Sequence, residues 1–95
     1  MSDAPEFFAN AQRIEAALRE QLAPSKLELQ DDSHHHVGHA GAREGRHYTL
    51  RIESERFIGL SRVARHRLVY DALAQLLPRG IHALAIDARA PGESR

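Results

Sequence analysis

The sequence predicts a small α+β domain, a two-layer sandwich in which two helices cover one face of a three-stranded mixed sheet. Two segments repeat apolar residues with a helical period, and three shorter segments alternate or are apolar in the manner of strands. Their order is helix, strand, strand, turn, helix, strand. The 95 residues suffice for one domain. We expect residues 1–6 and 91–95 to be flexible tails.

The first helix is predicted where apolar residues recur at spacings of four, three, four and four, which places them on one helical face. Pro24 ends this helix. Residues 26–30 then alternate, with Leu27 and Leu29 on one side, and predict a short strand. The apolar positions of the helix are Phe7, Ala11, Ile14, Leu18 and Leu22.

Residues 31–45 differ in kind from the segments beside them. They hold Ser33, three glycines and little that suits a core, which predicts a long exposed loop. Loops of this length are commonly functional. The segment also carries four of the seven histidines of the chain, His34, His35, His36 and His39, all internal to the sequence and so unlike a purification tag.

A second strand is predicted over 47–54, with Tyr48, Leu50 and Ile52 on its core side and antiparallel to the first. A turn follows at 57–59, and Ser61 is placed to cap a helix. Helical periodicity runs from there to Pro78 and Gly80. Residues 81–88, almost wholly apolar, predict a third strand parallel to the second, because a helix crosses between them. The apolar stripe of the second helix is Val69, Ala72, Leu73, Leu76 and Leu77.

Composition argues against several classes of function. Thirteen basic and thirteen acidic residues balance, whereas a dedicated nucleic-acid protein usually has a basic excess. The absence of cysteine excludes thiol catalysis and disulfides. No apolar run is long enough for a membrane span, and no catalytic motif is present, so we expect a cytoplasmic protein that is not an enzyme.

Three ordered motifs resemble the BolA family. The segment 57–70 (FIGLSRVARHRLVY) is similar to its aromatic-x-Gly turn followed by Arg-His-Arg and an apolar pair. Residues 80–85 (GIHALA) resemble the family's closing strand with its histidine. Residues 31–36 (DDSHHH), followed by His47 and Tyr48, are similar to its acidic-Ser-x-x-His loop and second strand. The resemblance covers about Ile14 to Arg89.

This resemblance implies a fold related to type II KH domains. It also implies a monothiol glutaredoxin as partner, around a shared [2Fe–2S] cluster that the isolated, monomeric chain does not bind tightly. In that arrangement His36 matches the loop ligand and His82 the strand ligand, and the glutaredoxin and glutathione supply sulfur. The loop is longer than in many relatives and contains extra histidines, so His39 and His34 are further candidates. His47, beside the aromatic residue that begins the second strand, is another. The tail also lacks the tryptophan often found there.

Each candidate has a structural interpretation beside the functional one. His82 also suits a half-buried strand histidine bonded to a carbonyl, and His47 suits a surface strand residue. The histidine loop also suits a solvated segment with incidental metal affinity. A basic cluster at the start of the second helix is either a solvated face or a contact for a partner's carboxylates or nucleic acid. Its residues are Arg62, Arg65, His66 and Arg67, with Arg79 beyond the helix.

Three functional hypotheses follow. The first is the adaptor of iron–sulfur trafficking or iron and redox regulation implied above. The second is a nucleic-acid-binding transcriptional regulator that uses Arg62–Arg67, although the Gly-x-x-Gly loop of KH domains is here Gly59-Leu60-Ser61-Arg62, without the second glycine. The third is a zinc- or nickel-buffering loop that needs no partner.

Overall fold

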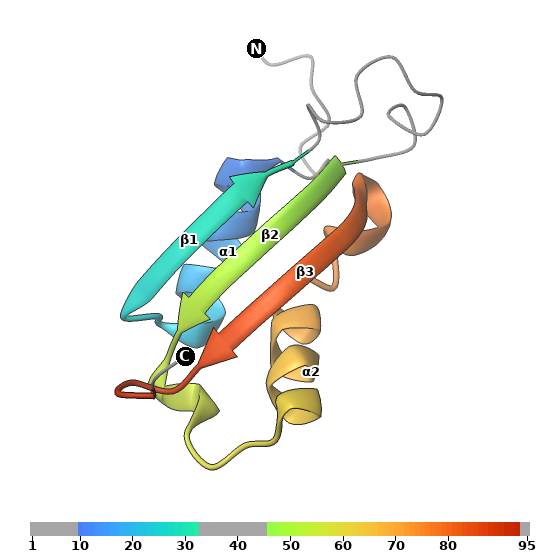
Figure 1. Cartoon of the computed structure of the whole chain (residues 1–95). Coiled ribbons are helices and arrows are strands. Elements are labelled where there is room, and N and C mark those ends of the chain that lie inside the picture. The colour runs from blue at the N-terminus through green and yellow to red at the C-terminus, as the bar shows by residue number, and fades with distance from the viewer. Residues whose placement is uncertain (1–9, 33–45, 94–95) are drawn as a thin grey trace.

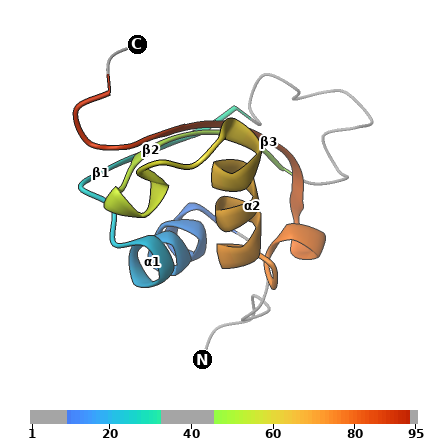
Figure 2. The same cartoon turned by 90° about the horizontal axis from the view of Figure 1, so that it is seen from below.

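A computed structural model describes residues 10–32 and 46–93 of the chain. Within them the sheet has the order β1-β2-β3, with β1 (Lys26–Asp31) antiparallel to β2 (Arg46–Glu53) and β2 parallel to β3 (Ile81–Arg89). Helices α1 (Ala11–Leu22) and α2 (Arg62–Ala72) both lie on one face of this sheet (Figures 1 and 2). The predicted two-layer α+β fold with a three-stranded mixed sheet is therefore confirmed.

Local sequence signals explain both ends of α1 and the start of α2. The Asn10 side chain accepts a hydrogen bond from the Arg13 amide at 2.8 Å at the start of α1. Ala23, with a φ of 44°, ends α1 in the left-handed conformation just before Pro24. Ser61 caps α2 as predicted, accepting a hydrogen bond from the Ala64 amide at 3.2 Å.

The core lies between the helices and the inner face of the sheet, and it confirms the predicted side of β2. Phe57, in the short 3-10 helix η3 (Glu55–Phe57), is fully buried, so the aromatic residue of the turn belongs to the core. Leu27, Leu29, Ile81, Leu84 and Ile86 pack against this core while partly exposed. The buried apolar residues are Ile14, Leu18, Leu22, Tyr48, Leu50, Ile52, Phe57, Val69, Leu73 and Ala90.

Two predictions need correction. The second helix ends at Ala72 rather than at Pro78, and a 3-10 helix, η4 (Leu77–Arg79), follows a turn. Leu76 and Leu77 nevertheless pack against the core, so their apolar spacing reflected burial and not continued helix. The tail is also less free than predicted, because Glu93 makes hydrogen bonds and an ion pair with the body of the domain. Phe7, predicted in the first helix, lies outside the described residues.

Candidate functional site

One end of the sheet brings together the segments that carry the candidate ligands. Asp32 leaves β1 here, and its amide donates to the His47 carbonyl at 2.7 Å. Arg46 enters β2 here, and its amide donates to the Gly80 carbonyl at 2.7 Å, one residue before β3. The residues that flank the histidine-rich segment 33–45, Asp32 and Arg46, therefore lie at the end of the sheet where β3 begins, Asp32 beside β2 and Arg46 beside the residue before β3. The candidates in that segment, His34, His35, His36 and His39, lie outside the described residues.

Side-chain contacts add to these backbone hydrogen bonds at both Asp32 and Arg46. The Thr49 hydroxyl and the Gln30 amide group donate to the two carboxylate oxygens of Asp32, at 2.6 and 2.7 Å. Arg46 pairs with Asp31 at 3.1 Å across β1 and β2. Burial, and then the negative charge of Asp31, raise the pKa of Tyr48. The tyrosine therefore stays neutral near physiological pH and belongs to the structural support of this end.

His82 lies at an irregularity of the sheet. Arg46 pairs with Ile81, but the next residue, His47, pairs with Ala83, so β3 has one extra residue at His82. Such bulges are common beside functional sites, because they change the direction in which the strand presents its residues. The backbone of His82 belongs to β3, whereas its side chain lies outside what the structure describes.

His47 occupies the neighbouring strand at the same end. Its side chain is half-buried, and a shallow hollow beside it is lined by Asp32, Thr49, Ala83 and Ala85. Nowhere in residues 10–32 and 46–93 do three or more histidine, aspartate or glutamate residues form a group suited to a metal ion.

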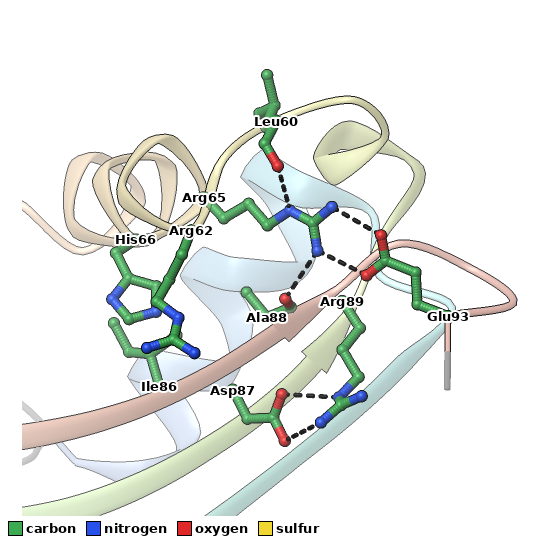
Figure 3. A pocket seen from close by; sticks show the side chains of 9 residues that line it. All are labelled: Leu60, Arg62, Arg65, His66, Ile86, Asp87, Ala88, Arg89 and Glu93. Atoms are coloured by element: carbon green, nitrogen blue, oxygen red, sulfur yellow. Dashed lines mark hydrogen bonds and ion pairs between the residues drawn. The ribbon is translucent and has the colours of Figure 1, made fainter. Parts of the chain in front are cut away.

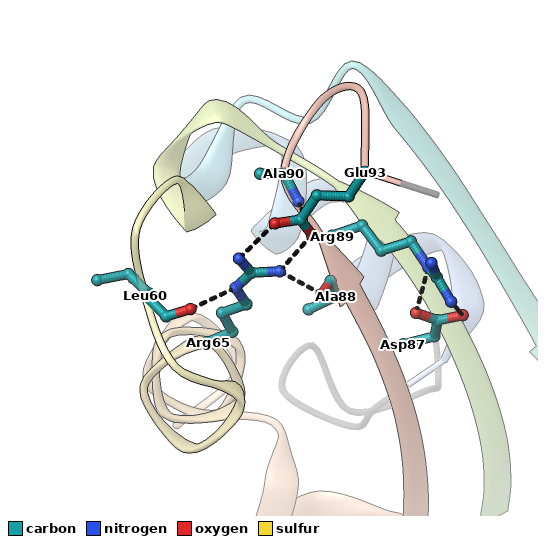
Figure 4. A network of polar contacts seen from close by, with 7 residues as sticks. All are labelled: Leu60, Arg65, Asp87, Ala88, Arg89, Ala90 and Glu93. Carbon is teal, nitrogen blue, oxygen red and sulfur yellow. Dashed lines mark hydrogen bonds and ion pairs between the residues drawn. The ribbon is translucent and has the colours of Figure 1, made fainter. Parts of the chain in front are cut away.

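The predicted basic cluster divides into two structural roles. Arg62 and Arg67 are exposed on α2, Arg79 is exposed in η4, and His66 is half-buried. Arg65 is different, because it is only 13% exposed and its guanidinium is engaged on every side (Figures 3 and 4). It donates to the carbonyls of Leu60 at 2.9 Å and Ala88 at 3.1 Å. The structure thus gives Arg65 a role in holding α2 against β3.

The sequence analysis did not identify Glu93, the main partner of Arg65. Its two carboxylate oxygens accept from Arg65 at 2.6 and 2.8 Å, and one also accepts from the Ala90 amide at 3.0 Å (Figure 4). The hydrogen bond from Arg65 is the main reason that the pKa of Glu93 falls from 4.5 to about 2. No sequence signal links two residues 28 positions apart in this way.

A cleft opens between α2 and β3 beside this ion pair (Figure 3). Its volume is about 580 Å³. Two of its arginines are paired with carboxylates, Arg65 with Glu93 and Arg89 with Asp87 at 2.8 Å. Arg62 and His66 line the same cleft without a side-chain partner among the described residues.

Charges of opposite sign alternate over the half of the open sheet face farthest from Asp32. Each row crosses all three strands, and one row contains an Arg51–Glu28 pair at 3.6 Å. This pattern leaves no stripe of one sign for a nucleic acid backbone to follow. The two rows are Lys26, Glu53 and Arg89, and then Glu28, Arg51 and Asp87.

Comparisons with known proteins agree with the predicted resemblance. The family model described as BolA-like protein matches residues 18–93. The SufE-like protein 1, chloroplastic/mitochondrial, of Arabidopsis thaliana is 46% identical over 87 residues, covering 85% of this chain and 24% of that protein. The chain thus spans about a quarter of that relative. The relative's name gives organelles as its location, so the expected cytoplasmic location of this chain stays a prediction. None of the helices in the described ranges has the length and apolarity to cross a membrane.

Solved structures agree with the family match. BolA1 from Arabidopsis thaliana superposes with a TM-score of 0.79 at 39% identity, covering 97% of this chain and 100% of that chain. The BolA domain of SufE1 from the same plant gives a TM-score of 0.76 at 44% identity, covering 90% and 99% of the two chains. With the family model matching most of its length and these structures sharing its fold, the chain belongs to the BolA-like family.

Proposed function

We propose that the chain is a non-enzymatic adaptor that pairs with a monothiol glutaredoxin and co-ligates a bridging [2Fe–2S] cluster through His82 and His36. Membership of the BolA-like family and the relation to a SufE-like protein are consistent with an iron–sulfur role. The single observation that carries the proposal is the position of the two residues that flank segment 33–45. Asp32 is hydrogen-bonded to β2 and Arg46 to the residue before β3, at the same end of the sheet as the bulge at His82.

The donor chemistry fits such a cluster. Neutral imidazole is a suitable ligand for iron, and two imidazoles on one iron raise the potential of a [2Fe–2S] centre. The chain has no cysteine, so the sulfur ligands have to come from the glutaredoxin and glutathione. His39, His34 and His47 are the next candidate ligands, His47 because it adjoins Asp32 and Arg46.

The test is to mix the chain with a monothiol glutaredoxin, glutathione, iron and sulfide without oxygen and to record visible circular dichroism. We expect a spectrum distinct from that of the glutaredoxin homodimer, and we expect it to be lost or altered in His82→Ala and His36→Ala. Gln21→Ala is the control, because Gln21 is exposed near the end of α1 and belongs neither to the proposed site nor to the basic cluster. An unchanged spectrum on adding the wild-type chain would contradict the proposal.

Two further measurements separate the alternatives. Binding to DNA through the helix residues Arg62 and Arg67 should weaken steeply between about 50 and 200 mM salt, whereas cluster bridging should change little. A zinc- or nickel-buffering loop should bind metal without glutaredoxin and should be unaffected by His82→Ala. Either result, together with no glutaredoxin-dependent spectrum, would replace the adaptor hypothesis.

A further inference from the structure

The outer edge of β3 is open along the cleft between α2 and β3. β3 is an edge strand of the three-stranded sheet, so no further described strand pairs with it on that side. The cleft is lined on one side by Ile86–Arg89 of β3 and on the other by Leu60, Arg62, Arg65 and His66 (Figure 3). An unpaired edge of this kind can take an additional strand.

The hydrogen bonds fix which peptide groups face the cleft. The Arg89 carbonyl accepts from the Ser54 amide at 3.0 Å, so the peptide groups of Arg89 face β2. Alternation then directs those of Ala88 and Ile86 away from β2, and Ala88 is consistent with this because its carbonyl accepts from Arg65. Arg65 thus occupies the carbonyl of Ala88. The amide and carbonyl of Ile86 and the amide of Ala88 remain available to hydrogen-bond with a ligand.

The charges in the cleft select the ligand. Glu93 and Asp87 neutralise Arg65 and Arg89, whereas Arg62 and His66 have no such side-chain partner in the part of the chain that the structure describes. A carboxylate group seated between Arg62 and His66 would complete the pairing. A polyphosphate backbone would instead approach two carboxylates in the same cleft, so the site favours a ligand with isolated acidic groups.

We propose that this edge binds an extended acidic peptide segment of a partner protein. The segment adds as a fourth strand beside Ile86, and one of its carboxylates pairs with Arg62 and His66. The position lies four or more residues along β3 from His82, about 13 Å or farther at the rise of a strand. The inference rests on the proposed function only for the biological partner, since peptide binding to the chain alone needs neither cluster nor histidine ligand.

The experiment is an NMR titration of the ¹⁵N-labelled chain with the blocked peptide acetyl-Val-Glu-Val-Glu-Val-amide. We expect the amide signals of Ile86 and Ala88 to shift. We also expect the peptide with glutamine in place of glutamate to bind about three- to fivefold more weakly, the effect of a partly exposed ion pair. A peptide with proline at its central position should lose binding, because proline removes a strand donor.

Variants of the chain make the test specific. Arg62→Gln and His66→Gln should abolish the preference for glutamate over glutamine, whereas Arg67→Gln, on α2 but outside the cleft lining, should preserve it. His82→Ala should bind the peptide as the wild type does, so failure of the cluster proposal is distinguishable from failure of this one. Equal binding of both peptides, or shifts confined to other strands, would overturn the inference. Stronger, salt-sensitive binding of an oligothymidine at the same signals would assign the cleft to nucleic acid instead.

Discussion

Replacing Ser54 with alanine tests how the end of β2 is held. Ser54 is the one polar residue among the described residues that is fully buried, with 0% of its surface exposed. Its hydroxyl donates to the carbonyl of Leu22 at 2.6 Å and accepts from the amide of Arg56 at 3.0 Å. The Ser54 side chain therefore pairs with a carbonyl in the last turn of α1 and caps the start of the 3-10 helix that carries Phe57.

The expected loss of stability follows from the groups that alanine leaves unsatisfied. A buried carbonyl without a donor costs about 1–3 kcal/mol, and this applies to Leu22, which is 2% exposed. The Arg56 amide belongs to an exposed residue, so water can partly replace its lost partner. We therefore expect a loss of about 2 kcal/mol, a large share of the roughly 5–15 kcal/mol typical of a domain.

The assay is urea unfolding followed by far-ultraviolet circular dichroism, together with thermal unfolding. A loss of about 2 kcal/mol should lower the melting temperature by roughly 8–16 °C in a domain of this size. Ser25→Ala is the matched control, because the Ser25 hydroxyl also bonds to a neighbouring strand, at 2.8 Å from the Glu53 carboxylate, but is exposed. We expect the control to lose less than about 0.5 kcal/mol. A Ser54→Ala variant as stable as the control would refute the argument that burial makes this hydroxyl important.

Three further predictions concern the Arg65–Glu93 ion pair and the Phe57–Gly59 turn. The folded state lowers the pKa of Glu93 to about 2, so the contribution of the ion pair to stability is complete above pH 4.5 and is lost as the pH falls toward 2. Glu93→Gln should therefore flatten the acid side of a plot of unfolding free energy against pH. An unchanged acid side would argue against the pair. Phe57→Ala should lower the free energy of unfolding in urea by about 3–5 kcal/mol. The control Val63→Ala, at a position 67% exposed, should change it by less than about 0.5 kcal/mol. Similar losses in the two variants would contradict the assignment of the aromatic residue to the core. Gly59 has a φ of +77° with no atom within 4 Å of an added Cβ, so Gly59→Ala should cost about 1–2 kcal/mol through backbone strain alone, and a neutral result in the same assay would show that the turn relaxes.

The sequence allowed the element order, the strand pairing and the core side of β2 to be predicted, because these depend on periodicity. Tyr48, Leu50 and Ile52 alternate with polar residues along β2. Because one face of the sheet is buried, these three side chains have to lie on that face. The end of α2 was less predictable. Leu76 and Leu77 continue the helical spacing of apolar residues, and their burial after a turn satisfies the same pattern without a helix.

The candidate site was predictable only in part, because its tertiary contacts have no sequence signature. Arg65 was grouped with its neighbours as a surface cation, since nothing near it in sequence indicates that Glu93 would occupy its guanidinium. The division of the cluster into paired Arg65 and unpaired Arg62 and His66 required the structure. The identity of the loop ligand stays a prediction, as His36 lies outside the described residues.

A bulge interrupts the alternation of side chains at the start of β3. Ile81 and Leu84 both pack against the core, although they are three residues apart and strict alternation would place them on opposite faces. The register shift after Arg46 adds one residue to β3 and lets both face inward. His82 belongs to the irregular step of the β2–β3 ladder, and Arg46, on the other side of that step, is hydrogen-bonded to Gly80, so regular pairing between β2 and β3 begins only after this end of the sheet.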